Sequence, residues 1–482
     1  MSVRDEVVEP PLSRQLFGAS RRAITIGTLL LTSMVAFESM GVGTAMPALV
    51  SELGAVSHYA WPFVAFLAAA VFGTVLGGRW CDRAGPKAVL LLAPVLFSAG
   101  LIIAGSATGM PQLLAGRVLQ GLGAGSVTVA NYVLIAIVYP DRLRPAMFGL
   151  MSSAWVLPSL VGPPIAGLVT ERFSWRWVFF GLVPVALLAL SLVVPSVRRL
   201  DRTEAGRVDR AERAGRAAAP RRRGLVLAAL GASVGVSGLS FGSQSPGPVS
   251  AVVVVIALLV LVPAMRLLLP RGVFRARRGV PAVVACRGLC AALFFTATSY
   301  LPLIMTSTHH WSLAAAGTPL VVGSLGWSAA SWWQGSRPEL PRQVLLRTGF
   351  CLLAGGALAL QLVASSWGIA WLALPVWAVA GVGMGLVFPS VAFLLLRQSA
   401  PGQVGFHSSA AQMADQLSSA TMIGVGGALL ALLGTASRAM PLLLAVLALL
   451  GVLGALIAGR APSREPPSRE PSGIEASGTA GS

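Results

Sequence analysis

The sequence predicts an all-α protein that crosses a lipid bilayer many times. Of its 482 residues, 55% are hydrophobic and only 11% are charged, and the mean hydropathy is +0.77. A soluble globular protein carries about 25% charged residues, so most of this surface cannot face water. The chain also contains many apolar runs of the roughly 20 residues that a helix needs to cross a bilayer. Together these observations disfavour a soluble protein.

Fourteen apolar segments are long enough to span the membrane. The first is too long, and is followed by too many others, to be a cleaved signal peptide. Twelve spans with a cytoplasmic 224–269 region are the alternative, but that region is too apolar to lie in water. We therefore expect helices at 23–48, 60–78, 88–106, 111–137, 145–170, 176–196, 224–242, 249–269, 280–305, 312–335, 344–364, 368–395, 403–433 and 438–459.

The basic residues indicate the orientation of these spans. The net charge is +19, from 36 Lys and Arg against 17 Asp and Glu. If the N-terminus is cytoplasmic, the outer loops hold only Arg172, Arg176 and Arg438, while Arg117 and Arg287 fall within spans. Every other basic residue lies on the cytoplasmic side, as the positive-inside rule requires. We therefore expect a plasma (inner) membrane protein with both termini in the cytoplasm.

Several classes of protein are disfavoured by missing features. The apolar runs leave no room for the soluble basic face of a nucleic-acid binder. Lys87 is the only lysine, so the chain has no G-x-x-x-x-G-K-[ST] loop for ATP phosphates. Cysteines and histidines are dispersed, and no nucleophile elbow or metal-binding helix motif is present. We expect no catalytic residue, cofactor or metal, and a polytopic membrane enzyme remains a remote alternative.

Four ionisable residues fall inside predicted spans, namely Glu38, Arg117, Arg287 and Asp415. Each costs about 2.5–3.5 kcal/mol on insertion, so such residues usually face a bundle interior and mark proton or substrate pathways. A carboxyl group in a low-dielectric cavity can hold and release a proton near neutral pH. Glu38 and Asp415 are therefore proton-coupling candidates, although Asp415 could instead lie near the surface. Arg287 is expected to snorkel back to the cytoplasmic face.

The loop after the second span reads Gly78-Arg79-Trp80-Cys81-Asp82-Arg83-Ala84-Gly85-Pro86-Lys87. Its glycines permit a tight turn, and Asp82 can accept hydrogen bonds at a helix N-terminus. The loop resembles the G-x-L-x-D-R-x-G-R-K signature of the major facilitator superfamily, with Trp80 and Pro86 replacing Leu and Arg. A turn that only sets topology is the alternative. The resemblance implies a cytoplasmic latch, stabilising the outward-facing state, made of Gly78, Asp82, Arg83, Gly85 and Lys87.

The fourth span contains Arg117-Val118-Leu119-Gln120-Gly121-Leu122-Gly123, which is similar to the R-x-x-Q-G-x-G motif of the same superfamily. The resemblance implies that the arginine takes part in proton transfer. Arg117 cannot lose its own proton, but its fixed charge can tune a nearby carboxyl group, for which Glu38 is the obvious candidate. The motif residues are Arg117, Gln120, Gly121 and Gly123.

The fifth span contains Gly149, Pro158 and the run Gly162-Pro163-Pro164-Ile165-Ala166-Gly167. Glycine and proline bend a helix and allow another helix to approach closely. The segment resembles the motif that distinguishes antiporters from symporters in the superfamily, with Pro158 and Ala166 replacing two glycines.

Two further segments point to one branch of the superfamily. Trp175-Arg176-Trp177-Val178-Phe179 looks like the W-R-W-x-F segment of the 14-span drug:proton antiporters. Glu38 and Pro47 have the interval of the D…P pair in the first helix of that branch, with Glu replacing Asp.

These motifs cover roughly residues 35–185, and the resemblance implies the major facilitator fold. That fold consists of two six-helix bundles with pseudo-two-fold symmetry, here with two extra inserted helices. We expect a cytoplasmic N-terminal segment (1–22), an N-terminal bundle (23–197), an Arg-rich cytoplasmic linker (198–223), two inserted transmembrane helices (224–269), a C-terminal bundle (270–460) and a disordered cytoplasmic tail (461–482).

The function that these features predict is proton-coupled export of small hydrophobic or amphiphilic compounds, such as drugs, by a monomer that uses alternating access and no ATP. A dedicated exporter of one endogenous metabolite or lipid and a proton:nutrient symporter remain open. Most tryptophans near predicted span ends, among them Trp327, are expected to be interfacial anchors. A minority could line a drug cavity.

Overall fold

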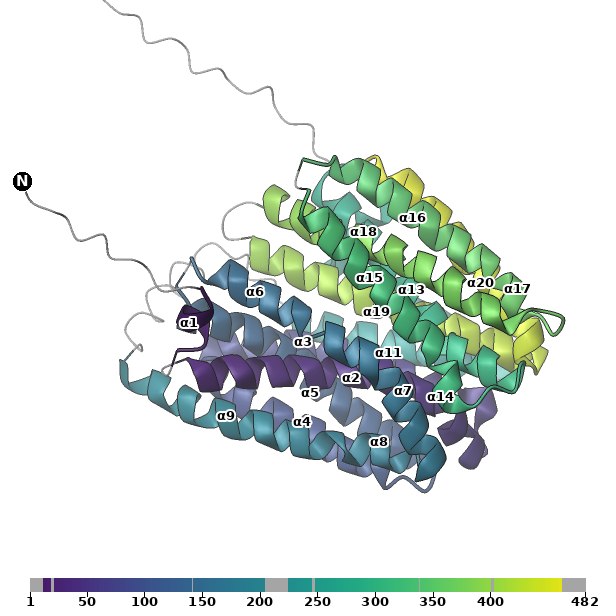
Figure 1. Cartoon of the computed structure of the whole chain (residues 1–482), viewed down its shortest axis with the longest axis horizontal. Helices are drawn as coiled ribbons and strands as arrows, with labels where there is room; N and C mark the ends of the chain where they lie inside the picture. Colours follow the sequence, from purple (N-terminus) through teal and green to yellow (C-terminus); the bar gives the residue numbers. More distant parts are fainter. Residues whose placement is uncertain are drawn as a thin grey trace, which may run out of the picture.

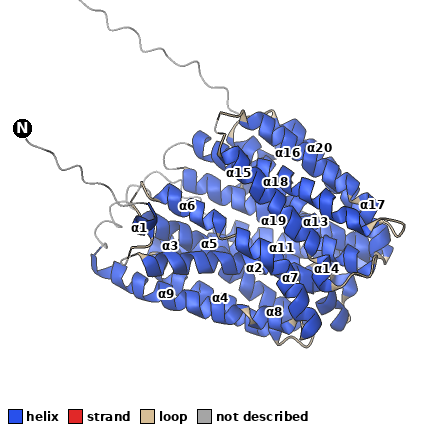
Figure 2. Cartoon of the chain, in the orientation of Figure 1, coloured by secondary structure: helices blue, strands red, loops and turns tan. Residues whose placement is uncertain are grey.

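The structure is a computed structural model that describes residues 12–18, 21–140, 142–203, 224–244, 248–337, 339–399 and 403–461. Within these ranges the chain is helical with short loops, and no strand is present (Figure 2). Most of the predicted linker (204–223) and all but the first residue of the predicted tail (462–482) lie outside the described residues.

The N-terminal bundle follows the short helix α1 (Leu12–Leu16). Two of its six spans are each built from two consecutive helices, α6 with α7 and α8 with α9. Its elements are α2 (Arg22–Glu52), η1 (Val56–His58), α3 (Trp61–Ala84), α4 (Pro86–Gly105), α5 (Met110–Val138), α6 (Arg144–Ser153), α7 (Val156–Arg172), α8 (Arg176–Phe180) and α9 (Leu182–Thr203).

The C-terminal bundle repeats this plan, with α14 and α15 sharing one span and α16 and α17 another. Helices α11 (Leu225–Gln244) and α12 (Pro248–Leu268) come between the bundles in the sequence, followed by η2 (Val273–Arg275). The bundle itself consists of α13 (Val280–Ser307), α14 (Leu313–Ala316), α15 (Thr318–Gly335), α16 (Arg342–Ala359), α17 (Gln361–Ala364), η3 (Ala370–Leu372), α18 (Ala373–Gln398), α19 (Val404–Leu433) and α20 (Ala436–Ala458).

The structure confirms the predicted number of membrane-spanning segments, because 14 helical stretches among the described residues are long and apolar enough to cross a bilayer. The two bundles lie side by side in Figure 1, with purple-to-teal helices in one and green-to-yellow helices in the other. Helix α11 contacts α3 of the first bundle, α19 of the second and its own partner α12. The inserted pair therefore packs along one flank where the bundles meet.

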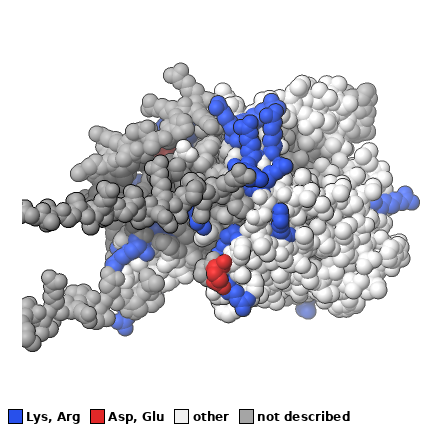
Figure 3. Space-filling view, turned by 90° about the horizontal axis from the view of Figure 1, so that it is seen from above, with Lys and Arg blue, Asp and Glu red and all other residues white. Residues whose placement is uncertain are grey.

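The assembly has two ends, which we name after α1 and η1. Thr25 at the start of α2 hydrogen-bonds to Leu16 O of α1 and to the Tyr139 hydroxyl at the end of α5, which defines the α1 end. At the opposite, η1 end lie the short helices α8, α14 and α17 (Figure 1). Lys and Arg side chains gather mainly toward the α1 end in Figure 3.

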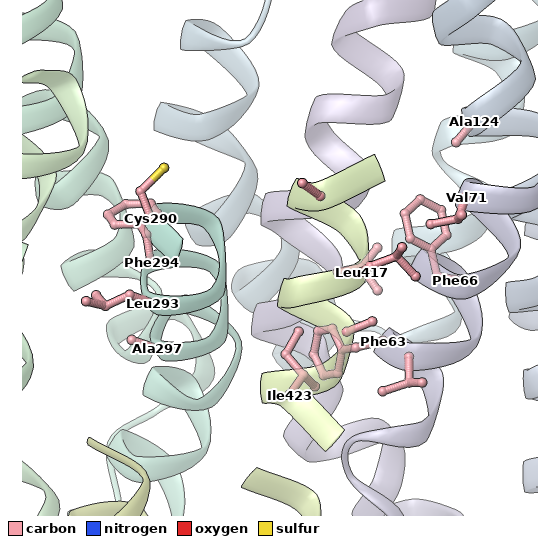
Figure 4. Packing of buried hydrophobic residues seen from close by; sticks show 14 of the residues in the cluster. Phe63, Phe66, Val71, Ala124, Cys290, Leu293, Phe294, Ala297, Leu417 and Ile423 are labelled. Atoms are coloured by element: carbon pink, nitrogen blue, oxygen red, sulfur yellow. The ribbon is translucent and has the colours of Figure 1, made fainter. Parts of the chain in front are cut away.

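Contacts between the bundles concentrate near the η1 end. The Tyr59 hydroxyl donates to Ser299 O of α13 at 2.8 Å, and its ring lies 5.3 Å from that of Tyr300. Helix α7 packs on α14 and α15, whereas α6, the other half of the same span, packs on α2 and α5. Deeper in the assembly, Leu417 of α19 lies beside Phe66 of α3 (Figure 4). These contacts close the η1 end of the space between the bundles.

Candidate functional site

A buried ion pair joins α2 and α5 inside the N-terminal bundle. Arg117 Nη1 donates to Glu38 Oε1 and, at 2.7 Å, to Gln120 Oε1, while its Nε donates to Pro62 O at 3.0 Å. The guanidinium group also lies 4.6 Å from the centre of the Phe66 ring. Glu38 is 1% exposed and Arg117 is 2% exposed. The structure thus brings together the carboxylate, the arginine and the glutamine singled out in the sequence.

Two atoms of this cluster have no hydrogen-bond partner among the described residues, namely Glu38 Oε2 and Gln120 Nε2. Leaving a buried polar atom unpaired costs free energy. Glu38 Oε2 can therefore accept a proton without first giving up a hydrogen bond. This makes the Glu38 carboxyl group chemically suited to bind a proton while its other oxygen stays with Arg117.

The glycines of the fourth-span motif bring α5 against its neighbours. A Cβ at Gly121 would lie 2.2 Å from Phe66 O on α3, and one at Gly123 would lie 2.7 Å from Ala93 O on α4. Only glycine permits these backbone approaches. The close packing of α5 on α3 is what holds Arg117 within reach of the first turn of α3.

A second ion pair lies in the C-terminal bundle, between α13 and α19. Arg287 donates to Asp415 Oδ2 from Nε at 3.1 Å and from Nη2 at 2.9 Å, and its guanidinium carbon lies 3.3 Å from the centre of the Phe388 ring. The prediction that Arg287 snorkels to the surface is wrong, because a carboxylate and an aromatic face within the bundle bind its charge. Asp415 is buried, so the alternative of a solvated surface position is wrong as well.

The fifth span is broken where its motif begins. Pro158 has no N–H to donate to Ala154 O, the acceptor four residues earlier, and the helix is interrupted between α6 and α7. The hydroxyl of Ser33 on α2 donates to that free carbonyl at 3.0 Å. Further along, Gly162 lies against Gly41 of α2, with 3.3 Å between Gly162 O and a Cβ built on Gly41.

The end of the same motif contacts the other bundle. A Cβ on Gly167 would lie 2.6 Å from Ala314 Cα, and one on Gly317 would lie 3.0 Å from the carbonyl carbon of Pro163. Glu171 also accepts a hydrogen bond from the backbone N of Ala314 at 3.0 Å. Gly149, by contrast, lies in α6, where an added Cβ would meet nothing within 4 Å. The motif therefore forms the seam between the bundles at the η1 end.

The loop between α3 and α4 turns at Gly85, whose φ of +75° is in the left-handed region that favours glycine. Gly85 is also the N-cap of α4, without a side-chain capping bond. Asp82 lies in the last turn of α3 and is exposed, as is Arg83. That Asp82 accepts hydrogen bonds at a helix N-terminus stays a prediction. Gly78 and Lys87 lie on the two sides of this turn.

The Trp-Arg-Trp segment fastens the end of α2 to the start of α8. Glu52 accepts hydrogen bonds from Trp175 Nε1 at 2.7 Å and from Arg176 Nη1 at 2.6 Å. Arg176 Nη2 also donates to Ala107 O at 3.2 Å. This clamp lies within the N-terminal bundle, as does Pro47, which is buried inside α2.

An aromatic cluster that was not predicted from the sequence lies next to the second ion pair. It consists of Phe294 and Phe295 of α13, Trp327 of α15, and Trp377 and Phe388 of α18. The signal that could have found it is position, because Trp327 lies in the middle of its span rather than at an end, where tryptophan anchors occur.

Two bundles of spanning helices, each with a charged pair buried in its interior, define a polytopic membrane protein. The sequence profile of the Major Facilitator Superfamily matches residues 28–421, and the chain belongs to that family. This is a family of membrane transporters rather than enzymes, and the predicted resemblance and the all-helical fold are confirmed.

Curated relatives and solved structures agree with this assignment. The chain is 24% identical to the multidrug transporter protein MdtP of Bacillus subtilis (strain 168), covering 80% of this chain and 72% of MdtP. It is 31% identical to multidrug resistance protein 3 of the same strain, covering 36% of this chain and 34% of that protein. A solved D-xylose-proton symporter superposes with TM-score 0.66 at 16% identity, covering 92% of this chain and 98% of that one. Several matches, including protein 3, thus span only about a third of the relative.

Proposed function

We propose that the protein is a proton-coupled antiporter that exports small hydrophobic or amphiphilic compounds, such as drugs, across the plasma membrane by alternating access as a monomer. The observation that carries the proposal is the Glu38 carboxyl group, buried against Arg117 with Oε2 unpartnered among the described residues. The names of the relatives MdtP and multidrug resistance protein 3 support the class of cargo.

The distribution of charge supports an orientation with the α1 end in the cytoplasm, since basic side chains gather toward that end. In this orientation the contacts of Tyr59 and Gly167 with the other bundle lie on the outer side. The arrangement corresponds to a state that is closed to the outside. Cargo enters it from the cytoplasm or the inner leaflet, and rocking of the bundles then opens the outer side.

Coupling follows from the competition of a proton with the Glu38–Arg117 pair. In the outward-open state, a proton binds Glu38 Oε2 and weakens the attraction of the carboxyl group to Arg117. Return to the inward state carries this proton to the cytoplasm, where cargo binding releases it, because proton and cargo bind in competition. For an uncharged cargo, each proton moved down a potential of 100 mV yields about 2.3 kcal/mol, and a tenfold cargo gradient costs about 1.4 kcal/mol. For a monovalent cationic cargo exchanged one for one, the potential contributes nothing, and a tenfold proton concentration ratio supplies about 1.4 kcal/mol. The proton gradient therefore suffices without ATP.

The proposal is tested in two steps. A susceptibility panel on cells with and without the protein, repeated with the proton gradient collapsed, identifies a cargo. Uptake of that cargo is then measured in proteoliposomes with an imposed pH gradient for wild type, Glu38→Gln and Glu52→Gln. Glu52 is a matched control, because its carboxylate is half-exposed and bonded to Arg176 and Trp175.

We expect Glu38→Gln to lose pH-driven transport while cargo counterflow without a gradient persists, and Glu52→Gln to behave as wild type. Normal pH-driven transport by Glu38→Gln would show that this carboxyl group does not couple transport, and Asp415 would be tested next. If cargo instead moves across the membrane in the same direction as the protons, the protein is a symporter and not an antiporter.

A further inference from the structure

Five aromatic rings from three helices pack together in the C-terminal bundle. The centre of the Phe388 ring lies 5.2 Å from that of Trp327, and Trp327 lies 5.5 Å from Phe294 and 6.4 Å from Phe295. Phe294 in turn stacks on Trp377 with centres 5.0 Å apart. Faces of such rings attract apolar groups and organic cations.

Trp327 and Phe388 lie on the sides of α15 and α18 opposite exposed bulky residues of these helices. On α15, the exposed residues Leu325 and Trp332 lie on the side opposite Trp327. On α18, exposed Phe393 lies on the side opposite Phe388. Both Trp327 and Phe388 are nevertheless only half-buried. Both rings therefore lie on the sides of α15 and α18 that contact α13, as the contacts of Trp327 with Phe294 and of Phe388 with Arg287 show.

The third accessible ring, Phe295, belongs to a central helix. Helix α13 contacts α2 of the other bundle as well as α14, α18, α19 and α20 of its own. Between Val280 and Met305 none of its residues is exposed, and Phe295 is among the few that are half-buried. Because α13 packs on helices of both bundles, the accessible part of Phe295 lies within the assembly rather than on its outer surface.

The cation that touches this cluster is the protein's own Arg287, held over the Phe388 ring and against Asp415. The side chains of Arg287 and Asp415 are 12% and 10% exposed, whereas those of Arg117 and Glu38 are 3% and 0% exposed. The pair is thus reachable at its edge. A carboxylate beside an aromatic face is the combination that binds an organic cation.

We propose that Arg287 is a tethered occupant of a cargo subsite, from which a planar aromatic cation displaces it. The cation takes the place of the guanidinium group against Asp415 and Phe388 and stacks with Trp327 and Phe295. This inference rests on the proposed export function and names the class of cargo. Gln416, the residue after Asp415, has a buried Oε1 with no partner among the described residues, and the proposal assigns it as the acceptor of the displaced guanidinium group.

The displacement of Arg287 determines which compounds bind at this subsite. Aromatic anions and neutral aromatic compounds gain nothing from Asp415, and a cation binds only by outcompeting an arginine that is already in place. Removing the arginine should therefore strengthen cation binding, which is the opposite of the effect expected for a purely structural ion pair or for a site where Arg287 binds an anionic cargo.

The test is equilibrium binding of ethidium, a planar aromatic cation, and of fluorescein, a planar aromatic anion, to the purified full-length protein in nanodiscs at mildly alkaline pH. We expect Arg287→Gln to bind ethidium about tenfold more tightly, and Phe388→Leu to bind it about tenfold more weakly. Phe393→Leu is the matched control. It removes a ring of the same helix that lies on its outer face under Arg342, and should leave ethidium affinity unchanged.

Gel filtration and thermal unfolding check that each variant is folded. If the isolated carboxylate destabilises Arg287→Gln, Arg287→Lys replaces it, because lysine keeps the charge but loses the planar stacking and the forked hydrogen bonds. It should tighten ethidium binding by a smaller factor. The double variant Arg287→Gln/Asp415→Asn should lose this gain.

The proposal is overturned if ethidium binding is absent or unchanged in the folded Arg287 and Phe388 variants, or if Arg287→Gln weakens fluorescein binding instead. The binding and transport results distinguish failure of the Arg287 proposal from failure of the proposed function. Proton-driven export of another compound without these ethidium effects defeats this inference alone, whereas the expected ethidium effects without proton-driven transport defeat the antiport mechanism alone.

Discussion

Replacing Gly167 by alanine should shift the protein toward its outward-open state. The added Cβ would lie 2.6 Å from Ala314 Cα, where ordinary contact begins at 3.4 Å, and the opposing atoms belong to the backbone of the other bundle. Neither side can turn away, so α7 and α14 must separate. Overpacking of this kind costs about 1–3 kcal/mol. Only the state with the η1 end closed bears that cost, so the ratio of open to closed molecules should rise by about 5–150-fold.

The assay is a distance distribution between spin labels on opposite bundles at the η1 end. Phe173 and Arg438 are exposed there and can be replaced by cysteine after the exposed Cys351 is changed to serine. Gly149→Ala is the control from the same motif, because its Cβ would meet nothing within 4 Å. Equal shifts in the two variants, or no shift for Gly167→Ala, would refute the role of the seam.

Three further substitutions test other contacts. Ser33→Ala leaves the Ala154 carbonyl freed by Pro158 unsatisfied, and should lower the free energy of unfolding, measured by thermal unfolding, by about 1 kcal/mol. Ser39→Ala is the control and should cause no such loss, because the Ser39 hydroxyl donates to Val35 O in its own helix turn. Arg176→Ala removes the ion pair with Glu52, whose side chains are 31% and 51% exposed. Because solvent screens this pair, the free energy of unfolding should fall by less than about 1 kcal/mol, and a larger fall would show that the pair is not screened. Asp82→Asn should slow transport and change the balance of inward and outward states if the loop is a latch, and unchanged values would leave it a topogenic turn.

The fold was predictable because a bilayer imposes a simple requirement on sequence. Every spanning helix must be apolar for about 20 residues, and the two helices α11 and α12 were found on that ground alone. The positions of close helix packing were also predictable from glycine and proline motifs, since a close backbone approach such as that of Gly167 to Ala314 excludes larger residues.

Pairing between distant helices was harder to predict. Arg287 was misassigned because its sequence neighbours do not reveal that Asp415, 128 residues later, lies beside it and offers a better partner than the membrane surface. The break between α6 and α7 was expected only as a bend, because the role of Ser33 depends on how α2 and the fifth span are aligned. The aromatic cluster around Trp327 likewise requires three helices to be placed in space.

The central claim is that the Glu38 carboxyl group exchanges a proton during transport. The most direct measurement is proton release on cargo binding, followed with a pH indicator in weakly buffered solutions of purified protein. Wild type and Glu52→Gln should release protons when cargo is added, and Glu38→Gln should release none. Undiminished release from Glu38→Gln would place the transported proton on another group and contradict the mechanism.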